Sequence, residues 1–119
     1  MFVNYSNHPS SKWNKEQIEA AYEYGDIIDV PFFQVDPACS SDEVKTIAEK
    51  ETEKIMSYDP SAVLCVGDFS LTYQIVTNLK EKGIKVLSAS SKREVIEEKT
   101  DSGENTKKTV FKFEGFREY

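Results

Sequence analysis

The stretch Ala62-Val63-Leu64-Cys65-Val66-Gly67-Asp68-Phe69-Ser70 decides the fold. Five apolar residues in a row are typical of a β-strand that is covered on both faces. Gly67 and the three residues after it form a tight turn, and apolar residues at helical spacing continue through residues 71–82. Gly83 ends that helix, and a further apolar strand follows at residues 84–89. Strands joined by a single helix must be parallel, so this stretch predicts one strand–helix–strand unit.

The chain before this unit repeats the pattern. Residues 2–5 and 26–30 read as strands, and the helix between them ends at Gly25. Ser40 and Glu43 have capping-box spacing and open a second helix. After the unit, residues 94–99 and 109–114 alternate partly by twos around a polar turn, which predicts a β-hairpin. We therefore expect one domain over residues 1–119: a small three-layer Rossmann-like α/β fold, with a doubly wound parallel sheet of four strands, three helices and a C-terminal antiparallel hairpin.

Composition narrows the function. The 119 residues carry a net charge of −6, which disfavours duplex DNA as a partner because phosphate contacts need Lys and Arg. No apolar stretch approaches the ~18 residues of a membrane span, and the first residues do not resemble a signal peptide, so we expect a cytoplasmic protein. Cys65 lies in the apolar strand and is expected to be a buried thiol. The single His has no second ligand cluster, so we expect no metal and no cofactor.

The candidate site follows from topology. In a doubly wound sheet of order 2-1-3-4, ligands bind at the carboxyl ends of strands 1 and 3, where the winding reverses. Three loops would meet there, at residues 6–13, 67–71 and 88–93. An order of 3-2-1-4 is also possible and would move the switch point.

These loops hold the only His and many Ser, Asn and Gly residues. We expect His8 to act as acid or base, and Lys92 and Arg93 to supply positive charge. The helix after Gly67 offers free N–H groups to an anion. The ligand-binding candidates are Ser6, Asn7, Ser10, Trp13, Gly67, Asp68, Phe69, Ser70, Ser90 and Ser91. Each also has a structural interpretation: Gly67 fits a turn, Asp68 and Ser70 cap a helix, and Trp13 packs.

The first loop carries a resemblance. A strand followed by Ser6-Asn7-His8-Pro9, then Trp13 or Gln17 at the helix start, resembles the opening of small CRISPR-associated proteins related to the CARF domain. The resemblance implies a Rossmann-like homodimer that binds, or cleaves as a ring nuclease, a cyclic oligoadenylate second messenger at the dimer interface. Such cleavage requires no metal, because the ribose 2′-hydroxyl attacks the adjacent phosphorus in line.

Two other readings remain open. The chain is a non-enzymatic interaction module if its hairpin or sheet edge docks another protein. It is a metal-dependent phosphatase or receiver-like domain if Asp29, Asp36 or Asp68 gather at one strand end. Strand 1 ends in Asn4-Tyr5-Ser6 rather than in acids, which argues against the latter.

Overall fold

The computed structural model describes residues 1–119 and contains one five-stranded sheet in the order β2-β1-β3-β4-β5. Its strands are β1 (Phe2–Ser6), β2 (Ile27–Pro31), β3 (Ala62–Val66), β4 (Lys85–Lys99) and β5 (Asn105–Glu118). The first four strands are parallel, and β5 is antiparallel to β4. The predicted order 2-1-3-4 is confirmed, so the winding reverses between β1 and β3.

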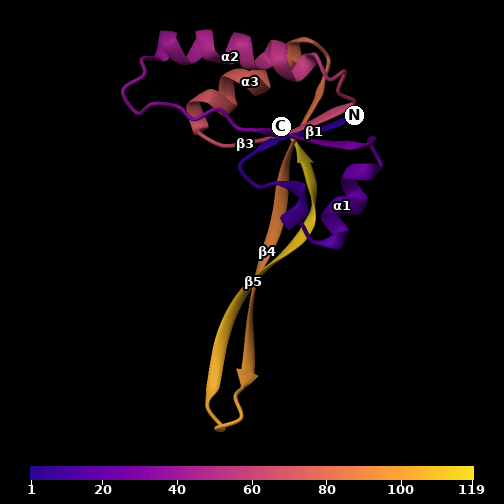
Figure 1. Ribbon diagram of the computed structural model, residues 1–119, viewed down its shortest axis with the longest axis vertical. Helices are drawn as coiled ribbons and strands as arrows, with labels where there is room; N and C mark the ends of the chain where they lie inside the picture. Colours follow the sequence, from indigo (N-terminus) through magenta and orange to yellow (C-terminus); the bar gives the residue numbers. More distant parts are fainter.

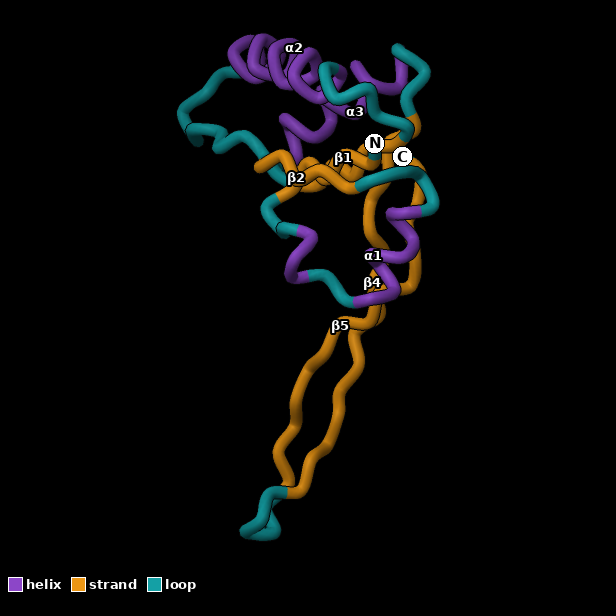
Figure 2. The backbone as a smooth tube through the Cα atoms, turned by 45° about the vertical axis from the view of Figure 1, so that its right-hand side comes forward, coloured by secondary structure: helices purple, strands orange, loops and turns teal.

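Three helices cover the two faces of the sheet (Figures 1 and 2). A 3₁₀ turn, η1 (Ser10–Lys12), and helix α1 (Lys15–Tyr22) lie on one face. Helices α2 (Ser41–Met56) and α3 (Phe69–Glu81) lie on the other. The predicted capping box of Ser40 and Glu43 is confirmed at the start of α2. Trp13, predicted within the first helix, instead lies just before it, because Asn14 is the N-cap residue of α1.

Strand alternation divides the core into two layers. Val3, Tyr5, Val63 and Cys65 belong to the larger core, against α2 and α3. Phe2, Ala62, Leu64 and Leu87 belong to the smaller core, against α1. Asn4 and Ser6 alternate with the large-core residues, so the α1 side of β1 becomes polar toward its carboxyl end. This change of polarity positions the site described below.

The prediction of a loop at residues 88–93 is wrong. Strand β4 continues from Lys85 to Lys99 and pairs with β5 along that length, with one β-bulge at Ser90/Ser91. The serines suggested a turn, but the chain has no glycine or proline between Gly83 and Gly103 to interrupt a strand. The predicted hairpin is confirmed, and it is the outer part of β4 and β5 rather than a separate unit.

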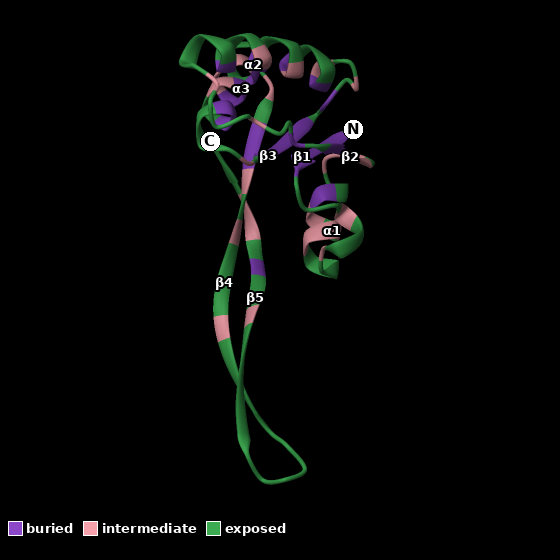
Figure 3. Cartoon of the chain, turned by 60° about the vertical axis from the view of Figure 1, so that its left-hand side comes forward, coloured by how far each residue is buried: buried purple, intermediate pink, exposed green.

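The hairpin leaves the body of the protein as an arm, which we define as residues 92–112. Pairing of β3 with β4 ends at Leu87, so the arm is two strands wide. The molecule measures 56 × 37 × 20 Å, and its radius of gyration is 17.3 Å. A compact chain of this length would have a radius of about 13.5 Å. Figure 3 shows that nearly all of the arm is exposed.

The C-terminal aromatic residues pack back on the sheet. The Phe116 ring lies 5.3 Å from Phe2, and Phe113 lies 5.0 Å from Phe116. The Tyr119 hydroxyl donates a hydrogen bond of 2.7 Å to the carbonyl oxygen of Cys65. These contacts fix the root of the arm beside β1 and β3.

One charged residue of α2 contacts the core. Glu51 accepts a hydrogen bond of 2.6 Å from the hydroxyl of the buried residue Tyr5. Burial, followed by this hydrogen bond, raises the pKa of Tyr5 above its usual range. The same hydroxyl accepts a hydrogen bond from the backbone N–H of Phe33, so β1 is tied to both α2 and the loop after β2.

Cys65 is fully buried, as the sequence predicts, and no helix of the protein is long and apolar enough to cross a membrane. Burial raises the pKa of the Cys65 thiol to about 12. The raised pKa keeps the thiol neutral in the folded state. The unfolded state would lose this proton above its ordinary pKa of 9.0, so folding stability falls as the pH rises from 9 toward 12.

We predict that an aromatic disulfide reagent at pH 8 labels the half-buried Cys39 readily and labels Cys65 only on unfolding, because the attacking species is the thiolate. The absorbance of the released thiolate measures the labelling of both cysteines. In the variant Cys39→Ser, only the slow labelling of Cys65 remains. Rapid labelling of two thiols in the folded protein would contradict the burial of Cys65.

Candidate functional site

A pocket of about 480 Å³ opens at the carboxyl ends of β1 and β3 and beside residues 89–91 of β4, on the side of the sheet that α1 covers. It contains side chains from the first loop, from three parallel strands and from the root of the arm. Its lining residues are Ser6, His8, Lys12, Trp13, Asn14, Gln17, Leu64, Val66, Ala89, Ser91, Phe111 and Phe113. We call it the switch-point pocket, because it lies where the sheet order predicts a ligand.

Asn4 organises the wall of this pocket that belongs to the first loop. Its side chain is almost fully buried, and its amide nitrogen donates to the His8 carbonyl oxygen and to Asp29, each at 2.9 Å. Its amide oxygen accepts a hydrogen bond of 2.7 Å from the Ser6 hydroxyl. A buried amide is costly unless its donors and acceptors are paired. Asn4 therefore fixes the loop relative to β1 and β2.

The His8 backbone is held firmly, while its side chain is exposed. The His8 carbonyl oxygen also accepts a hydrogen bond of 3.1 Å from the Trp13 indole nitrogen. The Trp13 ring meets Phe2 edge-to-face, with centroids 6.3 Å apart. Trp13 is thus both a packing residue and part of the pocket lining. The loop presents the His8 imidazole from a preorganised backbone.

The pocket is locally positive in an acidic protein. Lys12 and His8 line it, and no Asp or Glu does. Asp29, the carboxylate bound to the first loop, accepts hydrogen bonds from Asn4 and from the Ser10 backbone N–H and hydroxyl. Asp29 is thus bound to the loop and is not part of the pocket lining. The pocket therefore suits an anion, and Trp13, Phe111 and Phe113 give it aromatic walls.

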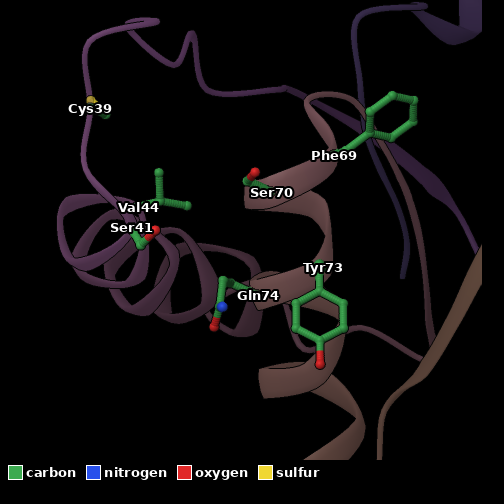
Figure 4. A pocket seen from close by; sticks show the side chains of 7 residues that line it. All are labelled: Cys39, Ser41, Val44, Phe69, Ser70, Tyr73 and Gln74. Carbon is green, nitrogen blue, oxygen red and sulfur yellow. The ribbon is translucent and has the colours of Figure 1, made fainter.

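A second cleft of about 400 Å³ lies on the opposite face of the sheet (Figure 4). It is formed by the starts of α2 and α3, and its lining residues are Cys39, Ser41, Val44, Phe69, Ser70, Tyr73 and Gln74. Phe69 is 92% exposed. The structure thus brings Phe69 and Ser70 together with the first turn of α2 rather than with His8. This cleft has no Lys, Arg or His in its lining.

Only some of the predicted site residues lie in the switch-point pocket. Ser6, His8, Trp13 and Ser91 line the switch-point pocket, whereas Ser10 bonds to Asp29. Asp68 is the N-cap of α3 and accepts from the Leu71 N–H. Asn7, Ser90, Lys92 and Arg93 lie outside the pocket lining. Lys92 pairs with Lys112 in the arm, and Arg93 pairs with Phe111.

Gly67 has a steric reason to be glycine. A Cβ atom at this position would lie 2.5 Å from the ring of Phe32, which is buried. Phe32 in turn packs on Tyr5, with ring centroids 4.9 Å apart. The turn after β3 therefore accommodates the loop after β2, and this close approach accounts for Gly67 without a ligand.

Sequence reasoning missed eight of the lining residues: Lys12, Asn14, Gln17, Leu64, Val66, Ala89, Phe111 and Phe113. Lys12 carried a detectable signal, because it is the one cation within the predicted loop 6–13. Phe111 and Phe113 could not be placed before the hairpin was known to continue β4. Their spacing of two indicated only that they share a face of a strand.

The hypothesis of a metal-dependent phosphatase or receiver-like domain rests on three Asp residues, and each of them has a structural partner. Asp29 supports the first loop, Asp68 caps α3, and Asp36 accepts a hydrogen bond of 2.8 Å from the Ala38 N–H. No group of three or more His, Cys, Asp or Glu side chains is placed to hold a metal ion. The geometry gives this reading no support.

One comparison with known proteins found a match. The model of the uncharacterized protein MJ1673 family matches residues 1–117, so the chain belongs to that family. The search of curated proteins and the search of solved structures each found no match. The resemblance to CARF-like proteins therefore stays a prediction.

We predict that Asn4→Ala lowers the free energy of unfolding by roughly 1–3 kcal/mol, because it removes the hydrogen bonds of Asn4 to Asp29, to the His8 carbonyl oxygen and to the Ser6 hydroxyl. Urea denaturation measures the loss. Asn7→Ala, on the exposed side of the same loop, is the control and should change stability by less than about 0.5 kcal/mol. Equal effects of the two substitutions would show that Asn4 does not organise the loop.

Proposed function

We propose that this member of the MJ1673 family binds a small anionic nucleotide in the switch-point pocket. One observation carries the proposal: a pocket of about 480 Å³ at the sheet's switch point is lined by Lys12, His8 and three aromatic rings, and by no carboxylate. In a chain of net charge −6, such a lining favours an anion with an aromatic part. A nucleotide has both.

The lining divides into regions of different chemistry. Trp13, Phe111 and Phe113 offer faces and edges on which a base stacks. Lys12 provides the charge for a phosphate. The amide side chains of Asn14 and Gln17 are suited to the donor–acceptor edge of a purine, although the Asn14 oxygen already caps α1. The size falls within the ~300–1,000 Å³ of small-molecule sites, which suits one nucleotide unit.

We extend the proposal, by the resemblance of the first loop, to a cyclic oligoadenylate signal in CRISPR-linked defence in the cytoplasm, bound by a homodimer. If the protein cleaves the ring, the 2′-oxygen forms a bond to phosphorus as the bond from phosphorus to the 5′-oxygen breaks. The 2′-proton passes to a base, and the 5′-oxygen takes a proton from an acid. His8 serves one of these proton transfers, and Lys12 stabilises charge on the phosphorane.

The structure favours Lys12 for the role first assigned to Lys92 and Arg93. Lys92 alternates with Ser91 along β4, so its side chain lies on the face of the strand away from the pocket. Arg93 shares the face of Ser91 but lies farther along the arm. Within one chain, Lys12 is therefore the better candidate for contact with phosphate.

A second candidate function is an interaction module without catalysis. The observation in its favour is the exposed arm, which extends beyond any helix that could cover it. Binding of a nucleotide and docking by the arm do not exclude each other, because the arm's root forms one wall of the pocket.

We predict that Lys12→Ala weakens nucleotide binding about tenfold, because it removes the pocket's one permanent cation. Trp13 is the only tryptophan, so its fluorescence reports binding directly when AMP or cyclic tetra-adenylate is titrated. The matched control is Lys15→Ala, because Lys15 is exposed and paired with Glu19 outside the pocket. No fluorescence change with any nucleotide, or equal loss in both variants, would contradict the proposal.

We further predict that His8→Ala lowers any turnover of cyclic tetra-adenylate by roughly 10²–10⁴-fold, the usual contribution of a general acid or base. Chromatography of the products measures the rate, and fluorescence titration shows whether binding survives. Turnover that is unchanged in His8→Ala would remove His8 from the chemistry. Binding without turnover in the wild type would identify a receptor rather than a nuclease.

A further inference from the structure

The arm has two faces of different character. Strand pairing places Ser91 opposite Phe113, Arg93 opposite Phe111, Val95 opposite Thr109 and Glu97 opposite Lys107. Directly paired residues share a face, so these eight residues form one surface, which we call the pocket-side face. Ser91, Phe111 and Phe113 also line the switch-point pocket. The pocket-side face is therefore the continuation of the pocket's wall onto the arm.

This face exposes apolar side chains that the chain itself does not cover. Phe111 is 70% exposed and Val95 is 59% exposed. A two-stranded ribbon is marginally stable in water unless another layer packs on it. The opposite face is less suited to packing, because Lys92 and Lys112 stand directly across from each other at the arm's root.

Charge indicates what covers the arm. Residues 92–112 contain six Lys or Arg and five Asp or Glu, a net charge of +1, whereas the other 98 residues contain nine and sixteen, a net charge of −7. The acidic body of one copy repels the body of another, whereas the arm carries charges of both signs that can pair with those of a second arm. The protein's two ion pairs, Lys15–Glu19 and Lys85–Glu118, lie outside the arm, so the arm's charges are free to pair with another chain.

The pocket-side face is also complementary to itself. We propose that a second copy of the chain packs on it, with the two arms face to face about a two-fold axis that runs along them. Such an axis places each β4 residue of one copy over its own register partner in the other. Glu97 then meets Lys107 of the second copy, and Arg93 meets the ring of Phe111 of the second copy.

The size of the arm sets the strength of this dimer. The face covers seven positions of each strand, and at about 3.3 Å per residue and about 4.8 Å between strands it is roughly 23 Å long and 10 Å wide. That is well below the ~800 Å² per partner of a stable complex. We therefore expect a dimer that dissociates at micromolar concentration.

One consequence rests on the proposed function. Because Phe111 lines the pocket, the arrangement adds Arg93 of the second copy at the pocket's rim to the Lys12 and His8 that line it in the first copy. Dimer formation would then strengthen binding of an anionic nucleotide. Arg93 would then act as a ligand-binding residue in the neighbouring copy.

Charge reversal and mixing test the dimer without any ligand. Glu97→Lys gives each copy like charges at the interface, and Lys107→Glu does the same with the opposite sign. Sedimentation velocity, run at a protein concentration well above the micromolar range, should therefore show the wild type as a dimer, each variant as a monomer of 13.6 kDa, and the equimolar mixture of the variants as a dimer. A change in hairpin stability within one chain cannot restore association on mixing. A monomeric wild type, or a mixture that stays monomeric, would overturn the proposal.

A matched pair on β4 tests the choice of face. Val95→Lys should abolish the dimer, whereas Ile96→Lys, one residue along and on the opposite face, should preserve it. The reverse result would overturn the assignment. Nucleotide affinity, measured with the same proteins, should fall in Glu97→Lys and recover in the mixture. A dimer with unchanged affinity would refute only the role of Arg93, and a dimer that binds no nucleotide would refute the proposed function.

Discussion

The site depends on the burial of one amide. Asn4 occupies a position of β1 where alternation calls for a residue of the small core, and its buried side chain must satisfy its hydrogen bonds inside the protein. It does so by binding Asp29, the His8 carbonyl oxygen and the Ser6 hydroxyl. Those three contacts fix the first loop at the switch point. The pocket wall and the presentation of His8 follow from them.

The sequence predicts the body of the fold well because the physical signals there are local. An all-apolar strand at residues 62–66, the capping box at Ser40 and the glycines at 25 and 83 each mark one element and its end. The right-handed crossover then restricts the topology. The length of β4 could not be predicted, because Ser90 and Ser91 resemble a turn and become strand only through long-range pairing with β5.

In the site, too, local signals were predictable and long-range pairing was not. Ser6, His8 and Trp13 were predictable from their places at and after the end of β1. Ser91 was assigned to the site as a loop residue, although it lies within β4. The sequence does not show which face of the sheet a residue after a strand will occupy. Phe69 and Ser70 were therefore assigned to the switch-point pocket, although they line the cleft on the opposite face. Phe111 and Phe113 are far from the loops in sequence and reach the pocket only because the hairpin begins inside the sheet. Non-local pairing, rather than residue chemistry, limited the prediction.

The most direct test is a nuclear magnetic resonance titration of the labelled protein with AMP and with cyclic tetra-adenylate. Binding in the switch-point pocket predicts chemical-shift changes at His8, the Trp13 indole, Ser91 and Phe111, and little change at Ser41, Ser70 and Tyr73. Changes confined to Ser41, Ser70 and Tyr73 would place the ligand in the second cleft. Those changes, or the absence of any shift, would contradict the account.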